Sequence, residues 1–500
     1  MIGRWLAISM VVKKDDYIEI SREGAIEYRD KLKNDYLYVE FEVPEGIKYI
    51  EISYSFSREK GCIIDIGIID SKGRFRGWSG SSKKNFFISR EKATPGYIEG
   101  EIDPGNWIVI LGLAKIPENE ICKYTVRICM SRKISRDADI RNSTEFRSYI
   151  KNNSAKEKNA NTSHRLRWIK GDLHTHTIHS DGRNTIHDLI YKAVEKGLEY
   201  VAITDHNTTS TSLEIKRLEE RGDIIPVKIL PGIEITTYYG HMNVWGGEWF
   251  DFRLRTREDF ISIIREVHRR NLAISINHPV RGIVDCIGCD FLFRDIRGFD
   301  ALEVWNGPWF AGNSNALEWW HDILCERYRV SAVGGSDYHG NRESPVDLGI
   351  PTTYIYADID SIESIIEAIK EGRTFVTATP SGPVINPIVY YNGNAYTIGD
   401  IVKIDSTRKT PLVSDIEVIG ASGYTLRLIG SSGVIKAIKI DDHRFNYRGE
   451  IIIDPENDPF VRFEIGEYSD PFSLKLKNSD IISVITSPIY IEPNIKNASL

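Results

Sequence analysis

Histidine, aspartate and glutamate recur in five short runs, each at or near the end of an apolar stretch of the sequence. The runs are GDLHTHTIHSDG (171–182), AITDHN (202–207), GIEITTYYGHMN (232–243), INHP (276–279) and GGSDYHG (334–340). They offer nine possible metal ligands: His174, His176, Asp181, His206, Glu234, His241, His278, Asp337 and His339. Imidazoles and carboxylates without thiolates suit Zn²⁺, Mn²⁺ or Fe²⁺. The runs therefore predict a metal-dependent hydrolase.

The spacing of these residues favours more than one ion. His174 and His176 are separated by one residue at the end of a strand, so both imidazoles project to the same side. Glu234 follows an apolar strand, where an unpaired carboxylate is costly to bury and one that bridges two cations is not. One zinc normally takes three or four protein ligands, so the set predicts two or three divalent ions. Metals about 3.5–4 Å apart can share a hydroxide, which predicts a metal-bridging hydroxide as the nucleophile.

Candidates for substrate contact lie beside the ligand runs in the sequence. They are Asn207, Asn277, Arg281, Trp305, Asn306 and Arg342. Asparagine and tryptophan can shape a pocket by hydrogen bonding and apolar contact, and a guanidinium can hold a phosphate through two hydrogen bonds. The alternatives are core or loop packing for the tryptophan and a plain surface position for the two arginines.

The elements that must position these residues lie between about 166 and 380. Apolar runs typical of strands are Tyr200–Ile203, Ile229–Ile233, Leu272–Ile276, Ala301–Val304, Val330–Val333 and Thr374–Thr377. They alternate with helical segments near 184–197, 256–270, 313–327 and 361–371. Such alternation predicts a parallel sheet or a (β/α) barrel, in which chemistry sits on the loops after the strands.

The flanking sequence has a different period. Residues 1–132 alternate apolar and polar side chains, as in Tyr49–Phe56, and similar segments at 62–69, 97–102, 106–114 and 121–130 predict a β-sandwich or jelly roll. The polar stretch 133–165 reads as a linker. Residues 381–500 return to short strands, with hairpin turns at Asn392-Gly393 and 431–433, and predict a second, smaller β-sandwich.

Composition narrows the class of protein. The net charge of −7 argues against a general nucleic-acid binder, and no run approaches the ~20 apolar residues of a membrane helix. The first 17 residues lack a long basic region and an obvious cleavage site, so they are predicted to form a first strand, with a secretory signal as the alternative. Six scattered cysteines form no disulfide framework and favour a reducing cytoplasm. Cys286 and Cys289 are predicted as free thiols, with a local disulfide as the alternative.

The order HxH, SDG, DH, GIE, H, NHP and SDxH over about 168–380 resembles the PHP (polymerase and histidinol phosphatase) superfamily of metallohydrolases. The flanking runs RGWSG (76–80), ATPGY (93–97), PGNWIVILG (104–112) and ITSPIYI (485–491) resemble the branch that includes carbaryl hydrolase. The resemblance implies a distorted seven-stranded (β/α) barrel, flanked here by the two predicted β-sandwiches, and up to three metals.

By this resemblance, each ligand has an expected partner. His174 and His176 would bind one ion with Asp337, and Glu234 would bridge it to a second ion held by Asp181 and His206. His241, His278 and His339 would hold a third. Asp337 is also the residue expected to orient or deprotonate the bridging water, so Asp337 and Glu234 are the predicted catalytic pair.

Three functions follow from these features. The first is a multinuclear metal-dependent phosphoesterase acting on a small molecule. The second is a carboxylic or carbamate ester hydrolase of the carbaryl-hydrolase type. The third is a non-catalytic binding protein on a degenerate barrel. Exposed strand edges in the flanking regions also make a homodimer an expectation.

Overall fold

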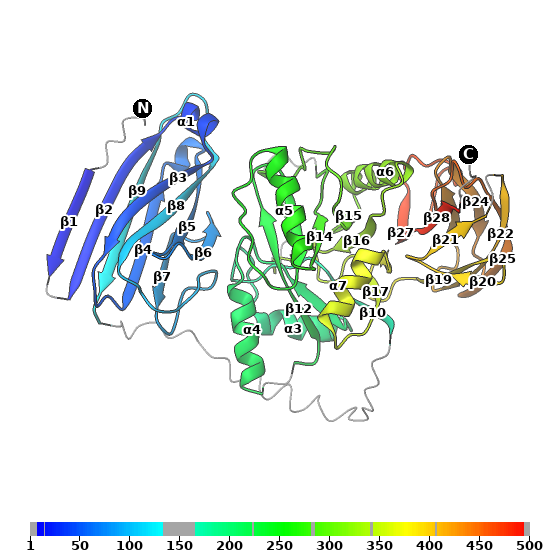
Figure 1. Cartoon of the computed structure of the whole chain (residues 1–500), viewed down its shortest axis with the longest axis horizontal. Coiled ribbons are helices and arrows are strands. Elements are labelled where there is room, and N and C mark those ends of the chain that lie inside the picture. Colours follow the sequence, from blue (N-terminus) through cyan, green and yellow to red (C-terminus); the bar gives the residue numbers. More distant parts are fainter. Residues whose placement is uncertain are drawn as a thin grey trace, which may run out of the picture.

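The computed structural model describes residues 8–14, 16–133, 166–222, 225–281, 286–340, 344–405 and 408–494. These residues form mixed α/β structure dominated by strands, in three adjoining regions that follow chain order (Figure 1). All but the first residue of the predicted linker 133–165 lies outside the described residues, and so does Arg342. No helix within the described ranges is long and apolar enough to cross a membrane.

The N-terminal region contains two antiparallel sheets and the short helices α1 (Tyr28–Lys33) and η1 (Arg58–Lys60). One sheet has the order β1 (Ile8–Lys14), β2 (Tyr17–Ile26), β9 (Cys122–Ser131), β4 (Tyr49–Phe56) and β7 (Asn85–Ser89). The other has the order β3 (Tyr36–Val43), β8 (Gly105–Lys115), β5 (Ile63–Ile69) and β6 (Phe75–Gly80).

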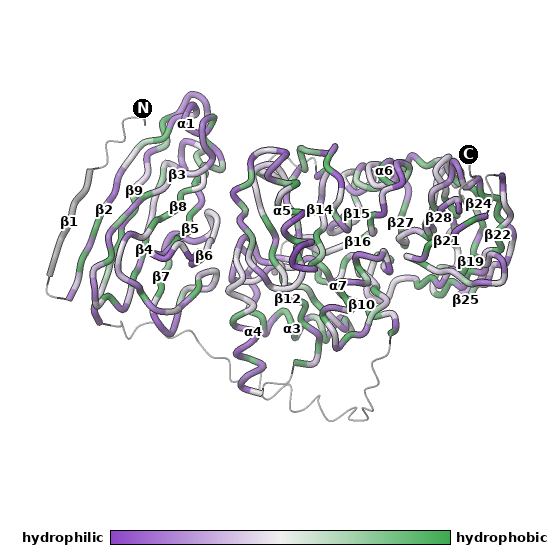
Figure 2. Tube along the Cα trace, viewed as in Figure 1, coloured by the Kyte–Doolittle hydropathy of each residue, from purple (hydrophilic) through white to green (hydrophobic). Residues whose placement is uncertain are grey.

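Alternation of side chains explains why these strands form. Along β4, Ile50, Ile52 and Tyr54 are buried and the residues between them are more exposed, as the period-two pattern predicts. Figure 2 shows hydrophobic and hydrophilic residues alternating along the strands of this region. Buried side chains of both sheets form one apolar cluster. The predicted strand at 97–102 is wrong, because no strand forms over those residues.

The central region contains seven consecutive strands whose order in the sheet equals their order in the chain. They are β10 (Arg167–Asp172), β11 (Tyr200–Ile203), β12 (Lys228–Thr236), β13 (His241–Trp245), β14 (Ala273–Ile276), β15 (Ala301–Asn306) and β16 (Ser331–Gly335). Neighbours are parallel except at β13, which is antiparallel to both β12 and β14. An all-parallel sheet is therefore wrong here. A turn in which the N–H of Thr237 bonds the carbonyl of Gly240 joins β12 to β13, and so tight a connection permits only antiparallel pairing.

Five helices accompany these strands, and four of them match predicted segments. They are α3 (Ile186–Glu195), α4 (Ser210–Glu220), α5 (Arg257–Arg269), α6 (Ala311–Cys325) and α7 (Ile362–Glu371). Thr185 and Thr256 cap α3 and α5 with their side chains, which fixes where these helices begin. Helix α4 was not predicted. Two of its buried residues are Ser210 and Thr211, so its apolar stripe is weak.

The last two strands of the central region bring the sheet back toward its start. Strand β17 (Thr352–Ala357) pairs with β10, and β18 (Thr374–Thr377) pairs with β17. The hydroxyl of Thr353 donates to the carbonyl of Gly334, and the hydroxyl of Thr374 donates to that of Ala332. Strand β16 therefore lies beside β17 and β18, although the described strands form no backbone ladder between them.

The C-terminal region continues the same hydrogen-bonded sheet. Strand β18 pairs with β27 (Ile481–Thr486), and the sheet runs on through β26 (Phe460–Glu467), β23 (Thr425–Gly430) and β24 (Gly433–Lys439). The pair β21 (Ile401–Ile404) and β28 (Ile489–Pro493) branches from it. A separate sheet has the order β20 (Asn394–Tyr396), β19 (Val384–Tyr391), β22 (Thr410–Ile419) and β25 (Arg444–Ile453). Both predicted hairpin turns are confirmed, between β19 and β20 and between β23 and β24.

Two pairs of cysteines are joined as disulfides. Cys62 and Cys122 connect the two sheets of the N-terminal region, and Cys286 pairs with Cys289. The prediction of free thiols at Cys286 and Cys289 is therefore wrong, and the local disulfide holds. Gly288 adopts a φ of 77°, which turns the chain so that the two cysteine Cα atoms lie 5.5 Å apart.

Candidate metal centre

The nine predicted ligands come together at one end of the central strands. His174 and His176 follow β10, Asp181 lies in the loop after them, His206 follows β11 and Glu234 lies near the end of β12. His241 begins β13, His278 follows β14, and Asp337 and His339 follow β16. Because these strands are neighbours in the sheet, the residues at their ends converge.

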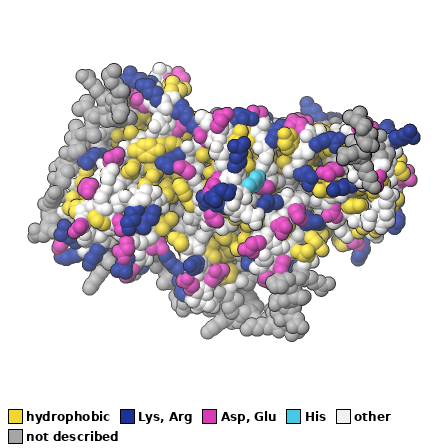
Figure 3. All heavy atoms as spheres, in the orientation of Figure 1, with side chains coloured by type: hydrophobic (Ala, Val, Ile, Leu, Met, Phe, Trp, Pro, Cys, Tyr) yellow, Lys and Arg dark blue, Asp and Glu magenta, His cyan; other side chains and the backbone are white. Residues whose placement is uncertain are grey.

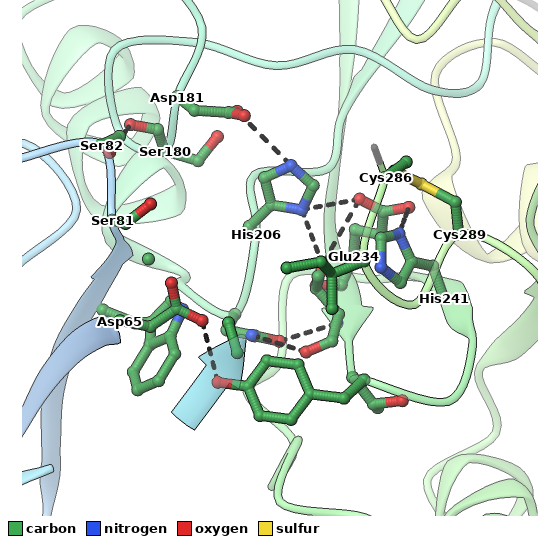
Figure 4. Close-up of a pocket in the computed structure, with 18 of the residues that line it drawn as sticks. Asp65, Ser81, Ser82, Ser180, Asp181, His206, Glu234, His241, Cys286 and Cys289 are labelled. Carbon is green, nitrogen blue, oxygen red and sulfur yellow. Dashed lines mark hydrogen bonds and ion pairs between the residues drawn. A yellow bond between two sulfur atoms is a disulfide. The ribbon is translucent and has the colours of Figure 1, made fainter. Parts of the chain in front are cut away.

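Glu234 lies at the centre of this convergence and is completely buried. Its Oε1 is 3.3 Å from Nε2 of His174, 3.3 Å from Nε2 of His278 and 3.4 Å from Nδ1 of His241. Its Oε2 is 2.7 Å from Nδ1 of His206 and 3.7 Å from Nε2 of His176. Figure 4 shows His206 and His241 on either side of this carboxylate. Both oxygens therefore face imidazoles, as a bridging carboxylate would.

A second group of ligand atoms surrounds Asp181. Its Oδ1 is 3.4 Å from Nε2 of His206 and 3.2 Å from Nε2 of His339. Atoms of these residues and of His176 all lie within 4.8 Å of one another. The expected grouping of His339 with His241 and His278 is therefore wrong: the chain after β16 carries His339 to the Asp181 side, and His241 and His278 share Glu234 instead.

The donor set fits divalent cations. Neither ring nitrogen of the buried His241 has a hydrogen-bond partner among the residues that the structure describes. The Nε2 atoms of His174 and His176 face each other at 3.1 Å. Buried polar atoms are normally paired, so unpaired imidazole nitrogens aimed at carboxylates indicate a place for a metal ion.

Neighbouring carboxylates and imidazoles of the centre shift one another's pKa values. Although burial opposes it, the positive imidazoles of His174 and His206 hold the pKa of Glu234 well below its usual range. Burial, with His339 and His206 nearby, lowers the pKa of His176 to about 4. Against its burial, the carboxylate of Asp181 raises the pKa of His339 to about 9. The carboxylates are thus ionised and His176 is neutral near pH 7, which are the forms that bind metals, whereas His174, His206 and His339 are protonated in the metal-free protein and would release a proton when an ion binds.

Glu303 is a member of the site that the sequence did not reveal. Its Oε1 is 2.9 Å from Nδ1 of His174, and its Oε2 accepts the backbone N–H of His278 at 2.7 Å. It is buried on β15, so only the pairing of strands brings it here. A carboxylate bonded to the far nitrogen of a ligating histidine fixes the orientation of the ring.

Two buried aspartates organise the loops. Asp205 accepts hydrogen bonds from the N–H and hydroxyl of Thr177 and from the hydroxyls of Ser180 and Thr211. Its oxygens are occupied, so Asp205 holds the 177–181 loop in place. Asp172 accepts the backbone N–H groups of His174, Ser336 and Gly349, and so ties the loops after β10 and β16 together.

Two of the proposed ligands have unusual backbone conformations. His278 has a φ of 26° and Asp337 a φ of 56°. Residues other than glycine rarely adopt positive φ, and such strain persists where surrounding contacts impose it. At Asp337 these contacts include the backbone bond from its N–H to the carbonyl of His174.

Of the described residues predicted to contact substrate, two line the pocket and three do not. Asn207 and Arg281 line the pocket above the ligands, and Nη1 of Arg281 is 2.6 Å from Oδ2 of Asp337. Asn277 instead donates to Oε1 of Glu234 at 2.9 Å. Trp305 and Asn306 are buried and do not line the pocket, so the structure gives their predicted role no support.

The pocket above the ligands has a volume of about 580 Å³. The central region supplies the metal-ligand wall, which includes His206, Glu234 and His241, and the Cys286–Cys289 disulfide lies beside them (Figure 4). Residues of the N-terminal region line the opposite side. Sequence reasoning allowed for a flanking region covering the mouth of the barrel but did not identify these residues, because they carry no ligand motif.

Comparison with known proteins agrees with this geometry. The model of the PHP domain family matches residues 172–285. A protein of uncharacterized function from Methanocaldococcus jannaschii is 32% identical over 157 residues, which are 29% of this chain and 88% of that protein. The chain therefore has a PHP domain and belongs to the PHP superfamily.

Two relatives with assigned names match shorter stretches. The 5′-3′ exoribonuclease Rnm of Escherichia coli is 31% identical over 121 residues, which are 24% of this chain and 31% of that protein. The phosphoribosyl 1,2-cyclic phosphate 1,2-diphosphodiesterase of Eggerthella lenta is 36% identical over 67 residues, which are 13% of this chain and 24% of that protein. The match to each spans a third or less of the relative's length.

Proposed function

We propose that this protein is a multinuclear metal-dependent phosphoesterase. The observation that carries the proposal is the environment of Glu234, a fully buried carboxylate whose two oxygens face the imidazoles of five histidines. Relatives named as an exoribonuclease and as a cyclic-phosphate diphosphodiesterase favour a phosphoester as the bond that is cleaved.

Each ligand has a role in this proposal. His174, His176 and Asp337 would hold one ion, Asp181, His206 and His339 a second, and His241 and His278 a third, and the Glu234 carboxylate is near residues of each group. When bound, divalent ions would supply a water nucleophile active at neutral pH and would neutralise phosphate oxygens. The imidazole and carboxylate donors favour Zn²⁺, Mn²⁺ or Fe²⁺ as the bound ions.

The chain's own residues position the substrate and the ligands. The guanidinium of Arg281 contacts Oδ2 of Asp337. From this position it would bind a nonbridging oxygen of the substrate phosphate. Asp337 holds its other oxygen 3.1 Å from Nε2 of His176 and would accept the proton of the attacking water. Glu303 and Asn277 orient His174 and Glu234.

We also propose an architecture for the central and flanking regions. The central region is a distorted (β/α) barrel whose seven strands β10–β16 are closed through β17, which pairs with β10 and lies beside β16, and the side-chain hydrogen bonds from Thr353 of β17 and Thr374 of β18 to β16 support this closure. The flanking regions are β-sandwiches. The carboxylic or carbamate ester alternative rests on the resemblance to the carbaryl-hydrolase branch and on nearby tryptophans, and of these tryptophans Trp305 lies in the core and does not line the pocket.

A substrate panel tests the function. The metal-loaded protein is offered aryl phosphates, phosphodiesters, aryl acetates and naphthyl carbamates, and its metal content is measured by elemental analysis. We expect turnover of a phosphoester and at least two ions per chain. Turnover of only the acetate or carbamate would overturn the phosphoester assignment, and fewer than two ions without turnover would favour a binding protein.

A further inference from the structure

The pocket has a second wall that contains none of the proposed ligands. It is formed by residues of the N-terminal region, among them Tyr36, Asp65, Trp78, Ser81 and Ser82. Figure 4 shows Asp65, Ser81 and Ser82 across the pocket from Glu234 and His241. A substrate whose phosphate lies at the ligands would extend toward this wall.

Hydrogen bonds hold this wall in place on one side of the pocket. The hydroxyl of Tyr238 donates to Oδ2 of Asp65 at 2.8 Å, and the hydroxyl of Tyr239 donates to Oδ2 of Asp35 at 2.9 Å. Trp78 packs against Phe252, with ring centroids 4.6 Å apart. The N-terminal region and the turn between β12 and β13 therefore form one packed unit.

Contacts on the other side complete the attachment. The hydroxyl of Ser82 and the ammonium of Lys83 donate to the carbonyl of Ser180 at 3.3 and 2.6 Å. The backbone N–H of Gly96 donates to the hydroxyl of Ser210 at 3.1 Å. Ser180 precedes the proposed ligand Asp181, so the wall and the ligand loop are directly joined.

Asp65 gives the wall its chemical character. Among the residues that the structure describes, only Tyr238 donates a hydrogen bond to this carboxylate, and it uses Oδ2. Oδ1 is left to accept a hydrogen bond from a ligand. Burial raises the pKa of Asp65 to about 6, despite the hydrogen bond from Tyr238, so at pH 7 the carboxyl is mainly ionised.

The distribution of positive charge separates the two walls. Arg281 is the only lysine or arginine among the described residues that line the pocket, and it belongs to the ligand side. On the face seen in Figure 3, basic and acidic side chains are interspersed rather than gathered into a basic track. A nucleic-acid chain needs cations along its path, and the N-terminal wall of the pocket presents the Asp65 carboxylate instead.

We infer that the N-terminal wall selects the leaving group, and that Asp65 favours small phosphoesters whose leaving group has an aromatic or apolar body and a hydroxyl or amino donor. This inference rests on the proposed phosphoesterase function. The pocket volume of about 580 Å³ falls within the range of small-molecule sites, and Trp78 and Tyr36 provide apolar surface beside the carboxylate.

The test uses two nearly isosteric leaving groups. The full-length metal-loaded protein is assayed on 4-hydroxyphenyl and 4-methylphenyl phosphate, each as the monoester and as the methyl diester, and on a 5′-phosphorylated oligonucleotide. We expect kcat/KM to be about tenfold or more higher for the hydroxyl compound, because a hydrogen bond to a carboxylate is lost with the methyl group. Most of the difference should appear in KM.

Two variants identify the residue responsible. Asp65→Ala should abolish the preference for the hydroxyl compound, so that the ratio of the two kcat/KM values falls to about one. Glu59→Ala, which removes an exposed carboxylate of the same region outside the pocket, should retain it. Binding of the matching phosphonates, 4-hydroxyphenyl against 4-methylphenyl, gives the same ratio by calorimetry without turnover, and metal content checks that Asp65→Ala remains loaded.

The outcomes separate this inference from the proposed function. If the native protein cleaves both aryl phosphates equally, or if Asp65→Ala keeps the preference, the role of Asp65 is overturned and the phosphoesterase assignment stands. If the oligonucleotide is the better substrate, the small-molecule assignment is overturned. If no phosphoester is cleaved, the proposed function fails and the inference fails with it.

Discussion

Two completely buried glutamates show how different neighbours turn the same side chain to different uses. Glu464, in the C-terminal region, has each of its oxygens in contact with one guanidinium, from Arg427 or Arg462. Glu234, in the central region, faces imidazoles instead. A guanidinium is always protonated and completes an ion pair by itself. An imidazole can be neutral, and its lone pair can then bind a metal ion.

The residues around the two glutamates differ as well. Tyr468 lies against Arg427 with its ring centroid 3.8 Å from the guanidinium carbon, and Trp320 lies 5.2 Å from that of Arg462. These rings cover the arginine cluster. Glu234 instead borders a pocket of about 580 Å³. Burial of a carboxylate is thus a poor guide to function, and the protonation chemistry and accessibility of its neighbours are better ones.

The largest effect should come from Glu234→Ala. We expect phosphoester hydrolysis to fall by at least about 10³-fold and the metal content to fall by more than one ion per chain, because one carboxylate serves several ligand groups. Elemental analysis and turnover measure both. Near-normal metal content in this variant would break the comparison, since Glu234 would then be a structural carboxylate like Glu464.

Glu464→Ala should act on stability instead. Removing it leaves Arg427 and Arg462 buried without their carboxylate, which should lower the free energy of unfolding by about 3–5 kcal/mol, measured by urea unfolding of metal-free protein. Metal content of the folded protein should be unchanged. The matched control is the triple variant Arg427→Met, Glu464→Leu, Arg462→Met, which should recover most of the loss. Loss of bound metal in Glu464→Ala would contradict the separation of the two clusters.

The contribution of Glu464 and its two arginines to stability should depend on pH. Although burial opposes it, Arg427 and Arg462 lower the pKa of Glu464 from 4.5 to about 2. A carboxyl with a depressed folded-state pKa stabilises the fold above pH 4.5, and this contribution is lost as the pH falls toward 2. The stability difference between the native protein and Glu464→Gln, both metal-free, should therefore shrink by on the order of 3 kcal/mol over that interval. A difference that stays constant with pH would show that the pKa is not depressed.

The smallest effect expected is that of Glu303→Gln. An amide holds the ring of His174 less firmly than a carboxylate, so metal affinity should fall about 10–100-fold, measured by competition with a chelator. Glu318→Gln, an exposed change on α6, is the control and should leave affinity unaltered. An unchanged affinity in Glu303→Gln would mean that His174 is oriented by its other contacts.

Much of the local structure was predictable because its causes are local. The period-two alternation of Tyr49–Phe56 and the capping threonines Thr185 and Thr256 belong to a few consecutive residues. Helix α4 (Ser210–Glu220) was missed because part of its buried face is hydroxyl side chains that bond neighbouring loops. The reversed direction of β13 follows from a turn that carries no strong signal of its own.

The candidate site divides in the same way. Residue type and position after a strand were enough to select nine residues that the structure brings to one end of the central strands. Their grouping was not, and His339 lies with Asp181 rather than with His241 and His278. That outcome depends on how the loops after β10 and β16 are tied together by Asp172, which no short segment of sequence contains.

The sequence by itself determined which donor groups this protein can offer a metal ion, because imidazoles and carboxylates have the same donor chemistry wherever they lie, and their spacing places them at strand ends. Tertiary structure alone decided which donors lie together, which carboxylate orients them and what faces them across the pocket. His174 meets Glu303 across 129 residues, and Tyr238 meets Asp65 across 173. Contacts of that separation depend on strand pairing and on packing between regions, so no local pattern can specify them.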